Sequence, residues 1–264
     1  MSRGYLWFAQ NNSKTDYVEL SIKLAESIKK YNRHSNICVV TDKQSQFVSK
    51  YVDVVKVLKN DDSEKHNLKW ANEHQAFSVT PFTHTIKLES DMLWTTNTDW
   101  WWYHLWQHDL VFSVDCFNYK DQVVKDTPYR TLFIRNRLPN IYNGLMYFRK
   151  SNLAKKFFDI ARLISQNWQE VRTNLLINCH DRYPSTDVVF ALAYRIMDPT
   201  NKGLIDYEWF KFLHHKPAVN NLTAVKDQNN YLYPNRSGNS LYIGEKRISR
   251  LWHYFEKELD VRTS

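Results

Sequence analysis

The chain has 264 residues, of which 43% are hydrophobic and 15% aromatic, so it is long enough for one large domain with a sizeable core. Only 5 glycines and 7 prolines are present, which excludes a low-complexity chain or a linker, and no apolar run approaches the roughly 18 residues of a membrane span. The formal charge of +8 is compatible with a polyanionic partner such as nucleic acid.

The first part of the chain alternates short apolar runs with helical patterns. Four runs are predicted strands: residues 5–9, 37–41, 51–58 and 84–91. After the first strand, Asp16 and Glu19 have the spacing of a capping box, and apolar residues then recur at steps of three and four, which indicates a helix. A second helix is predicted at 68–77. This order favours right-handed crossovers and a parallel sheet.

The second part is less regular. Strands are predicted at 110–115 and 144–148, and helices at 151–168 and 184–197, the last beginning near Ser185. A basic loop, residues 125–139, lies between the two strands. The aromatic stretch at 95–109 is expected to pack in the core or at a partner interface. We see no internal repeat and no clear linker, so we predict one domain.

The cysteines and the N-terminus bear on the cellular compartment. Three cysteines lie far apart and form no CxxC pair: Cys38, Cys116 and Cys179. Such a sparse, odd count predicts reduced thiols in a cytosol-like compartment. The first residues, MSRGYLWFAQNN, lack the long apolar core and the cleavage site of a signal peptide. We therefore expect a cytoplasmic protein.

Polar groups end three of the predicted strands. They are Gln10 with Asn11, Asp42, and the triplet Glu89-Ser90-Asp91. In open α/β sheets the ligand crevice lies beyond the carboxyl ends of the strands, so these groups predict one nucleotide pocket.

The triplet is the most informative of these strand ends. In HTIKLESDMLW, alternation along a strand sends Glu89 and Asp91 in the same direction, and the small Ser90 between them leaves room for a nucleotide. A hard divalent cation is commonly held by one or two such carboxylates beside phosphates. The alternative is an exposed acidic pair at a turn. For the motif in isolation that alternative is favoured; the apolar flanks IKL and MLW, together with the further segments below, favour metal binding.

Four further segments, in order along the chain, extend this pattern. They are the opening WFAQNN, ICVVTD, YNGLMYFRKS and YPSTDVVFALA. With KLESDML in the place of the DxD motif, the ordered set resembles GT-A-type glycosyltransferases over most of the chain. Glu89 stands where that family has its first Asp. Its extra methylene allows contact with a ribose or a metal-bound water instead of the ion.

The resemblance implies an α/β, GT-A-like single domain over 1–264, with a central, mostly parallel twisted sheet flanked by helices. It implies a nucleotide-sugar half, about 1–115, and an acceptor half, about 116–264, which carries a smaller mixed sheet. It further implies a UDP-sugar donor and Mn²⁺ or Mg²⁺ held by Glu89 and Asp91. A C-terminal histidine, His215 or His253, would be the third ligand, and Lys216 in HHKP would contact phosphate.

The remaining donor and acceptor contacts follow from the same resemblance. Ala9, Gln10 and Asn11 would meet the base and ribose. Tyr17 would stack on uracil or, alternatively, pack in the core, and Asp42 would accept a hydrogen bond from the nucleotide or, alternatively, form a turn. On the acceptor side the resemblance implies three residues: Asn143 and Gly144 beside the sugar, and Asp187 as a base or a positioning group. Lys69 and Lys87 are candidate phosphate contacts, with surface lysines as the favoured alternative.

The acceptor is suggested by basic and aromatic residues around the loop. Arginine pairs with phosphate in bidentate geometry, and the three candidates are Arg130, Arg135 and Arg137. Aromatic faces between and beside them are Tyr129, Phe133 and Tyr142. The mix resembles tailed-phage enzymes that transfer a sugar onto modified cytosines in double-stranded DNA, which would act in the host cytoplasm. The alternatives are a transferase acting on polysaccharide, lipid-linked sugar or protein, and a non-catalytic nucleic-acid or carbohydrate-binding protein with a degenerate site.

Overall fold

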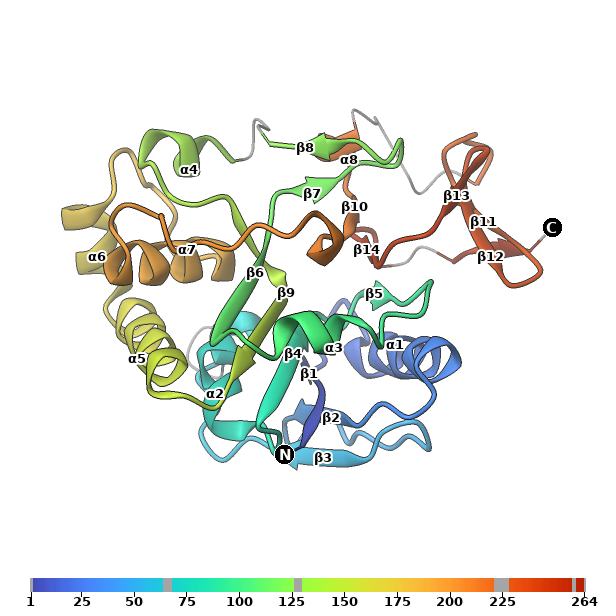
Figure 1. Cartoon of the computed structure of the whole chain (residues 1–264), viewed down its shortest axis with the longest axis horizontal. Coiled ribbons are helices and arrows are strands. Elements are labelled where there is room, and N and C mark those ends of the chain that lie inside the picture. The colour runs from blue at the N-terminus through green and yellow to red at the C-terminus, as the bar shows by residue number, and fades with distance from the viewer. Residues whose placement is uncertain (1, 64–67, 126–129, 221–227, 258–259, 264) are drawn as a thin grey trace.

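The structure is a computed structural model that describes residues 2–63, 68–125, 130–220, 228–257 and 260–263 (Figure 1). Its centre is a six-stranded sheet in the order β3-β2-β1-β4-β9-β6. The first four of these strands run parallel: β1 (Arg3–Ala9), β2 (Ile37–Thr41), β3 (Val54–Val57) and β4 (His84–Leu88). β9 (Ile141–Arg149) runs antiparallel to both β4 and β6 (Leu110–Val114). The predicted α/β fold with a mostly parallel central sheet is confirmed.

Helices cover both faces of this sheet, because its central strands are apolar on both sides. Trp7 of β1 packs on the face of α1 (Tyr17–Tyr31) and α3 (Trp101–Leu105). Leu6 and Phe8 of the same strand point to the opposite face, which is covered by α5 (Asn152–Gln166) and α7 (Thr186–Met197).

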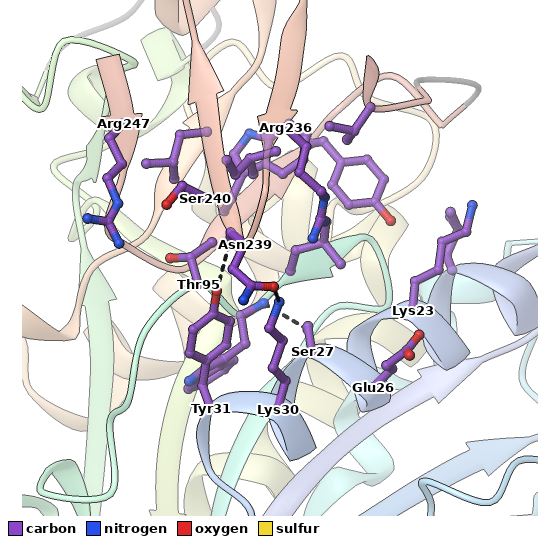
Figure 2. Close-up of a pocket in the computed structure, with 18 of the residues that line it drawn as sticks. Lys23, Glu26, Ser27, Lys30, Tyr31, Thr95, Arg236, Asn239, Ser240 and Arg247 are labelled. Carbon is purple, nitrogen blue, oxygen red and sulfur yellow. Dashed lines mark hydrogen bonds between the residues drawn. The ribbon is translucent and has the colours of Figure 1, made fainter. Parts of the chain in front are cut away.

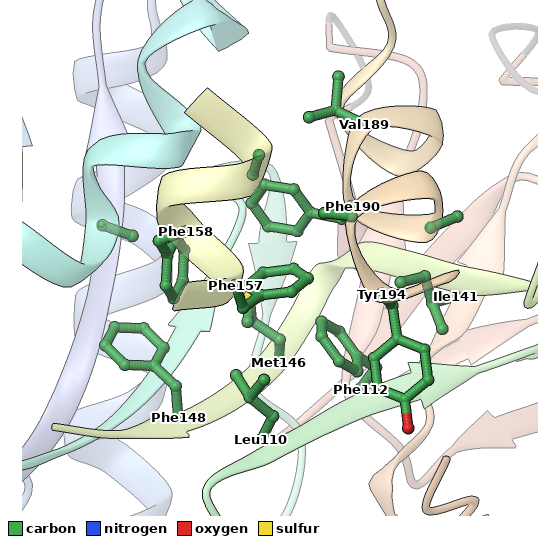
Figure 3. Close-up of a cluster of buried hydrophobic side chains, with 14 of the residues drawn as sticks. Leu110, Phe112, Ile141, Met146, Phe148, Phe157, Phe158, Val189, Phe190 and Tyr194 are labelled. Atoms are coloured by element: carbon green, nitrogen blue, oxygen red, sulfur yellow. The ribbon is translucent and has the colours of Figure 1, made fainter. Parts of the chain in front are cut away.

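Figure 3 shows the centre of the hydrophobic core between the sheet and helices α5 and α7. Phe157 of α5 lies 5.3 Å, ring centre to ring centre, from Phe112 of β6 and 5.2 Å from Phe190 of α7. All three rings are buried. This packing fixes α7 against β9 and so sets the position of the first turn of α7 near the cleft described below.

The predicted helix starts are confirmed by their caps. The Asp16 side chain accepts a hydrogen bond of 3.0 Å from the backbone nitrogen of Glu19. Ser151 and Ser185 cap α5 and α7 in the same way. The helix expected at 151–168 therefore begins one residue later, and it ends at Gln166 before a separate helix, α6 (Trp168–Leu175).

The segment expected as one helix at 68–77 is different. It forms a 3₁₀ helix, η1 (Lys69–Gln75), followed by one turn of α-helix, α2 (Ala76–Val79). Buried polar side chains of η1 bond to neighbouring segments, and these tertiary contacts override helix propensity. Thr80 is extended because Pro81 follows it.

Two smaller sheets complete the chain. The first is mixed, as predicted, in the order β5-β14-β10-β7-β8, with β10 parallel to both β14 and β7. Its strands are β5 (Met92–Leu93), β7 (Cys116–Phe117), β8 (Val123–Val124), β10 (Leu213–His215) and β14 (Trp252–Tyr254). The second sheet is not predicted from the sequence and comprises β11 (Pro234–Ser237), β12 (Ser240–Ile243), β13 (Lys246–Ile248) and β15 (Arg262–Thr263). It lies at the opposite end of the molecule from α5 to α7 (Figure 1).

Short helical turns link these parts: α4 (Thr131–Arg135), η3 (Glu208–Phe210) and α8 (Pro217–Asn220). In the aromatic stretch, Trp101 and Trp102 are buried, whereas Trp100, Tyr103 and Trp106 are 46%, 84% and 40% exposed, so only part of this stretch packs in the core. Among the described residues, no helix combines the length and the apolar character needed to cross a bilayer.

Candidate active site

A cleft of about 700 Å³ lies beyond the carboxyl ends of β1 and β4. Its walls come from the end of β1, from η1, from the turn after β4, from the start of α7, and from β10 and β14 with the residues that follow them. The expected crevice is therefore present at the expected edge of the sheet.

Three side chains with metal-ligand chemistry converge in this cleft. Nε2 of His253 lies 3.2 Å from Oε2 of Glu89 and 3.2 Å from Oδ2 of Asp91. One ligand atom from each of the three lies within 4.8 Å of the others. Ser90 and Asp91 form a turn, so the convergence does not come from simple strand alternation. It comes from the pairing of β5 with β14, which places His253 opposite Met92, next to Asp91.

A fourth group joins the cluster. The ammonium of Lys257, three residues after β14, contacts Oδ2 of Asp91. Burial lowers the pKa of Lys257 to about 8, while the negative charge of Glu89 opposes that shift. Sequence reasoning missed this residue, because it lies in a tail with no clear periodicity.

A buried lysine is connected to the cluster through Asn143. Lys87 of β4 is fully buried, so its interpretation as a surface lysine is wrong. Its Nζ contacts the carboxylate of Glu73 and donates to Oδ1 of Asn143 at 2.8 Å. Nδ2 of Asn143 in turn donates to Oε1 of Glu89 at 3.3 Å. Burial alone would raise the pKa of Glu89, but the nearby charges, that of His253 foremost, hold it below its ordinary value.

These contacts change the roles expected for Asn143 and Gly144. Asn143 is 1% exposed and links Lys87 to Glu89, so it supports the cluster and does not line the cleft. A Cβ atom on Gly144 would lie 3.2 Å from Oε2 of Glu89. The close approach that this glycine permits is therefore to the Glu89 carboxylate, and the prediction that both residues lie beside the acceptor sugar is not supported by their positions.

Asp187 lines the cleft, but Arg130 does not form a nucleic-acid surface. Oδ1 of Asp187 accepts from the backbone nitrogen of Asn143 at 2.7 Å, and Oδ2 accepts from Arg130 at 2.6 Å. Arg130 is 2% exposed, and its guanidinium lies over the rings of Phe133 and Tyr142 at 3.5 and 4.2 Å. The prediction that Arg130 meets phosphate, with these rings as stacking faces for bases, is wrong because all three are buried.

The two candidate histidines lie on opposite faces of the sheet that contains β10 and β14. His215 is fully buried, lies 5.8 Å from the Trp252 ring, and does not line the cleft. Burial lowers its pKa to about 4. The preceding residue, His214, points to the cleft and stacks on His253 at 4.5 Å. His215 is therefore excluded as a ligand by its position, and His253 belongs to the cluster.

The residues predicted at the end of β1 are mostly engaged with the protein. Ala9 is fully buried, and its carbonyl accepts from Thr41. Asn11 caps the approach to α1 by accepting from the backbone nitrogen of Val18 at 2.9 Å. Neither residue lines the cleft, so their contacts with base and ribose are not supported.

Other predicted nucleotide contacts do line the cleft: Gln10, Tyr17, Ser90 and Lys216. The amide nitrogen of Gln10 donates to Asp42 and Asp61 at 3.2 and 3.0 Å, which fixes its orientation. Nζ of Lys216 lies 4.8 Å from the centre of the Phe255 ring. This part of the cleft therefore offers an amide, a phenol, a hydroxyl and an ammonium.

Asp42 is a buried turn former, which was the alternative interpretation. Its Oδ1 accepts from the backbone nitrogen of Ser45 at 2.8 Å, and its Oδ2 accepts from Lys69 at 3.0 Å. Burial would raise the pKa of Asp42, but these hydrogen bonds and that from Gln10 outweigh it and lower the pKa to about 2. Lys69 lines the cleft, so it is not simply a surface lysine.

The other basic candidates lie away from this cluster. Arg135 and Arg137 are exposed, as a nucleic-acid contact requires, whereas Tyr129 lies outside the described residues. A separate cavity of about 380 Å³ between α1 and the four-stranded sheet is also lined by basic side chains, among them Lys30 and Arg236 (Figure 2). None of the three clustered metal-ligand residues lines it.

No protein-family model matches the chain, and no curated protein sequence matches it. Many solved structures are similar to its fold, among them the following two. Mouse xyloside xylosyltransferase 1, in its apo form, is 11% identical with a TM-score of 0.48, and the alignment covers 75% of this chain and 83% of that chain. The galactosyltransferase LgtC, in complex with donor and acceptor sugar analogues, is 13% identical with a TM-score of 0.45, over 72% of this chain and 70% of that chain. The function proposed below rests on the geometry of the cleft.

Replacing Arg130 by methionine is expected to lower the free energy of unfolding by about 3 kcal/mol, because Asp187 would lose its buried partner. Denaturant unfolding at pH 7 measures the change. Arg135→Met, at an exposed position of α4, is the matched control and should stay within about 0.5 kcal/mol of the parent protein. Equal effects of the two substitutions would contradict the structural role of Arg130.

Asp42 is expected to make the stability of the fold depend on pH in the acid range. Because the folded pKa of Asp42 is about 2, below its ordinary 3.8, its carboxylate stabilises the fold fully above about pH 4. That contribution is lost as pH falls from there through about 2. Asp42→Asn should cost about 2 kcal/mol at pH 7, and the gap from the parent protein should narrow below pH 4. Unfolding curves between pH 7 and 2 test this, and a gap that stays constant to pH 2 would rule it out.

Proposed function

We propose that the protein is a metal-dependent glycosyltransferase that moves a sugar from a UDP-sugar to an acceptor hydroxyl. The observation that carries this proposal is the convergence of Glu89, Asp91 and His253 in a cleft at the carboxyl edge of the sheet. The cleft volume of about 700 Å³ suits a nucleotide sugar, since ligand pockets commonly span about 300–1,000 Å³.

The three side chains of the cluster, Glu89, Asp91 and His253, fit a divalent cation as ligands. Two carboxylates supply the hard oxygen ligands that Mg²⁺ and Mn²⁺ prefer, and an imidazole nitrogen is a ligand that Mn²⁺ accepts. The ammonium of Lys257 against Asp91 indicates that this position favours positive charge. When bound, the ion would neutralise the charge that develops on a departing diphosphate.

The chain's own residues would bind and orient the two substrates. Tyr17, Gln10 and Ser90 line the cleft and would contact the nucleotide, and Lys216 would offer a positive charge for phosphate. Asp187 lies across the cleft with both oxygens already accepting hydrogen bonds. This arrangement suits a fixed carboxylate that orients the acceptor hydroxyl, and it also leaves lone pairs that can receive its proton.

An adjoining cavity of about 750 Å³ gives the acceptor room. It shares Trp70 and Tyr183 with the donor cleft, and the indole nitrogen of Trp70 donates to the carbonyl of Pro184 at 3.1 Å. Trp70 is 47% exposed, so its face is available for a sugar ring or a base. We infer that the acceptor enters from this side.

For the acceptor itself, hydroxylated or hydroxymethylated cytosine in duplex DNA, such as phage DNA, stays our leading candidate. The net charge of +8 and the exposed Arg135 and Arg137 support it. Polysaccharide, lipid-linked sugar and protein are the alternatives, and a binding protein without turnover is the rival outside enzymes.

Asp91→Asn is expected to reduce UDP release from UDP-sugars in the presence of Mn²⁺ by about 10²-fold or more, because a charged ligand of the cation is lost. A coupled assay for UDP, with and without a chelator, measures this. Asp159→Asn, which removes an exposed carboxylate on α5, is the matched control and should keep full activity. Metal-independent sugar binding without turnover in the parent protein would favour the non-catalytic rival.

The DNA acceptor predicts transfer of labelled sugar to duplexes that contain hydroxymethylcytosine and none to unmodified duplexes. Replacing Arg135 and Arg137 together by methionine should weaken duplex binding and reduce the salt slope of log K by roughly 2, one for each phosphate contact. Gel shifts across salt concentrations measure the slope. Transfer to a polysaccharide or protein, with no transfer to any duplex, would eliminate this acceptor.

A further inference from the structure

Lys257 contacts the cluster of Glu89, Asp91 and His253, and the proposed sugar transfer does not explain its position there. Its ammonium contacts Oδ2 of Asp91, the same oxygen that faces Nε2 of His253 at 3.2 Å. Lys257 therefore lies at the atoms that would bind a cation. Its side chain is 22% exposed, and that of Asp91 is 9% exposed, so water screens this pair only in part.

The cluster needs a positive charge for a physical reason. Asp91 is buried, and a buried carboxylate without a partner costs several kcal/mol. Lys87 already compensates Glu73 and is bonded to Asn143, so it is committed elsewhere. Lys257 supplies the charge that Asp91 requires.

An ammonium and a divalent cation cannot share this position. Lys257 occupies Oδ2 of Asp91, the oxygen next to Nε2 of His253, and like charges repel strongly at contact distance in a partly buried site. Besides Asp91, Nζ of Lys257 contacts the carbonyl of Tyr254, to which it donates at 3.3 Å, and lies 5.9 Å from the centre of the Phe255 ring, which is 44% exposed. The partly exposed Lys257 side chain can therefore leave Asp91 by rotating toward solvent, with the backbone in place.

We propose that Lys257 is a built-in counter-cation that competes with the divalent ion for the Glu89, Asp91 and His253 cluster. It stabilises the carboxylates when no ion is bound, and an incoming ion must displace it. The apparent affinity of the metal is then the intrinsic affinity multiplied by the fraction of molecules in which Lys257 has left. This inference rests on the proposed function for the identity of the cluster as a metal site.

The test is direct Mn²⁺ binding, without substrate or turnover. The purified protein is titrated with Mn²⁺, and free ion is followed by its electron paramagnetic resonance signal. Lys257→Met should bind Mn²⁺ at least about fivefold more tightly than the parent protein, the lower end of common coupling effects. Lys257→Arg keeps the charge and should bind it about as weakly as the parent.

Lys69→Met is the matched control. Lys69 lines the same cleft at a similar side-chain exposure of 17%, but it pairs with Asp42, outside the cluster. It should change Mn²⁺ affinity by less than about twofold. A comparable gain in both methionine variants would show a general effect of cleft charge and would overturn the competition.

The remaining outcomes separate this inference from the proposed function. Mn²⁺ binding that is abolished by Asp91→Asn but unchanged or weakened by Lys257→Met would overturn only the role of Lys257. If neither the parent protein nor Lys257→Met binds Mn²⁺, both the competition and the metal dependence of the proposed transferase are overturned. UDP release that persists in that case would leave sugar transfer itself intact.

Discussion

The site depends on one constraint, the compensation of charged side chains at the end of a buried strand. Lys87 lies within β4, and Glu89 and Asp91 follow at alternate positions. Each would cost several kcal/mol if buried without a partner. The partners come from four separate segments: η1, β9, β14 and the residues after β14. The convergence of these segments on one strand end is what creates the cleft.

β9 connects the end of β4 with the start of α7. On one side it pairs antiparallel with β4, which places Asn143 between the buried lysine and Glu89. The backbone nitrogen of the same residue donates to Asp187, which is anchored by Arg130. Through Asn143, a single strand thus links Glu89 and Asp187, two carboxylates that line the cleft. The rigidity comes from hydrogen bonds to charged groups, which are stronger than neutral ones.

Much of the fold could be predicted because its signals are local. Helix caps at Asp16, Ser151 and Ser185 depend on residues three apart, and buried strands appear as apolar runs, so both can be recognised without knowledge of distant contacts. The four-stranded sheet near the C-terminus was not predicted because its strands have only two to four residues, and most of these residues are polar. The burial of Lys87 did have a signal, since it stands between apolar residues two positions before Glu89. The usual exposure of lysine indicates the opposite, so the sequence alone does not predict this burial.

The sequence by itself determined the alternation of strands and helices, and it located Glu89 and Asp91 at a strand end where a cleft opens. Only the tertiary structure decided which distant groups complete that site. His253 rather than His215 joins the carboxylates because strand pairing sends neighbouring residues to opposite faces, and Arg130 is buried because Asp187 lies within its reach. The ammonium of Lys257 completes the cluster across more than half the chain. Contacts of this kind leave no periodic trace in the sequence, because they depend on how whole elements pack and not on the spacing of neighbouring residues.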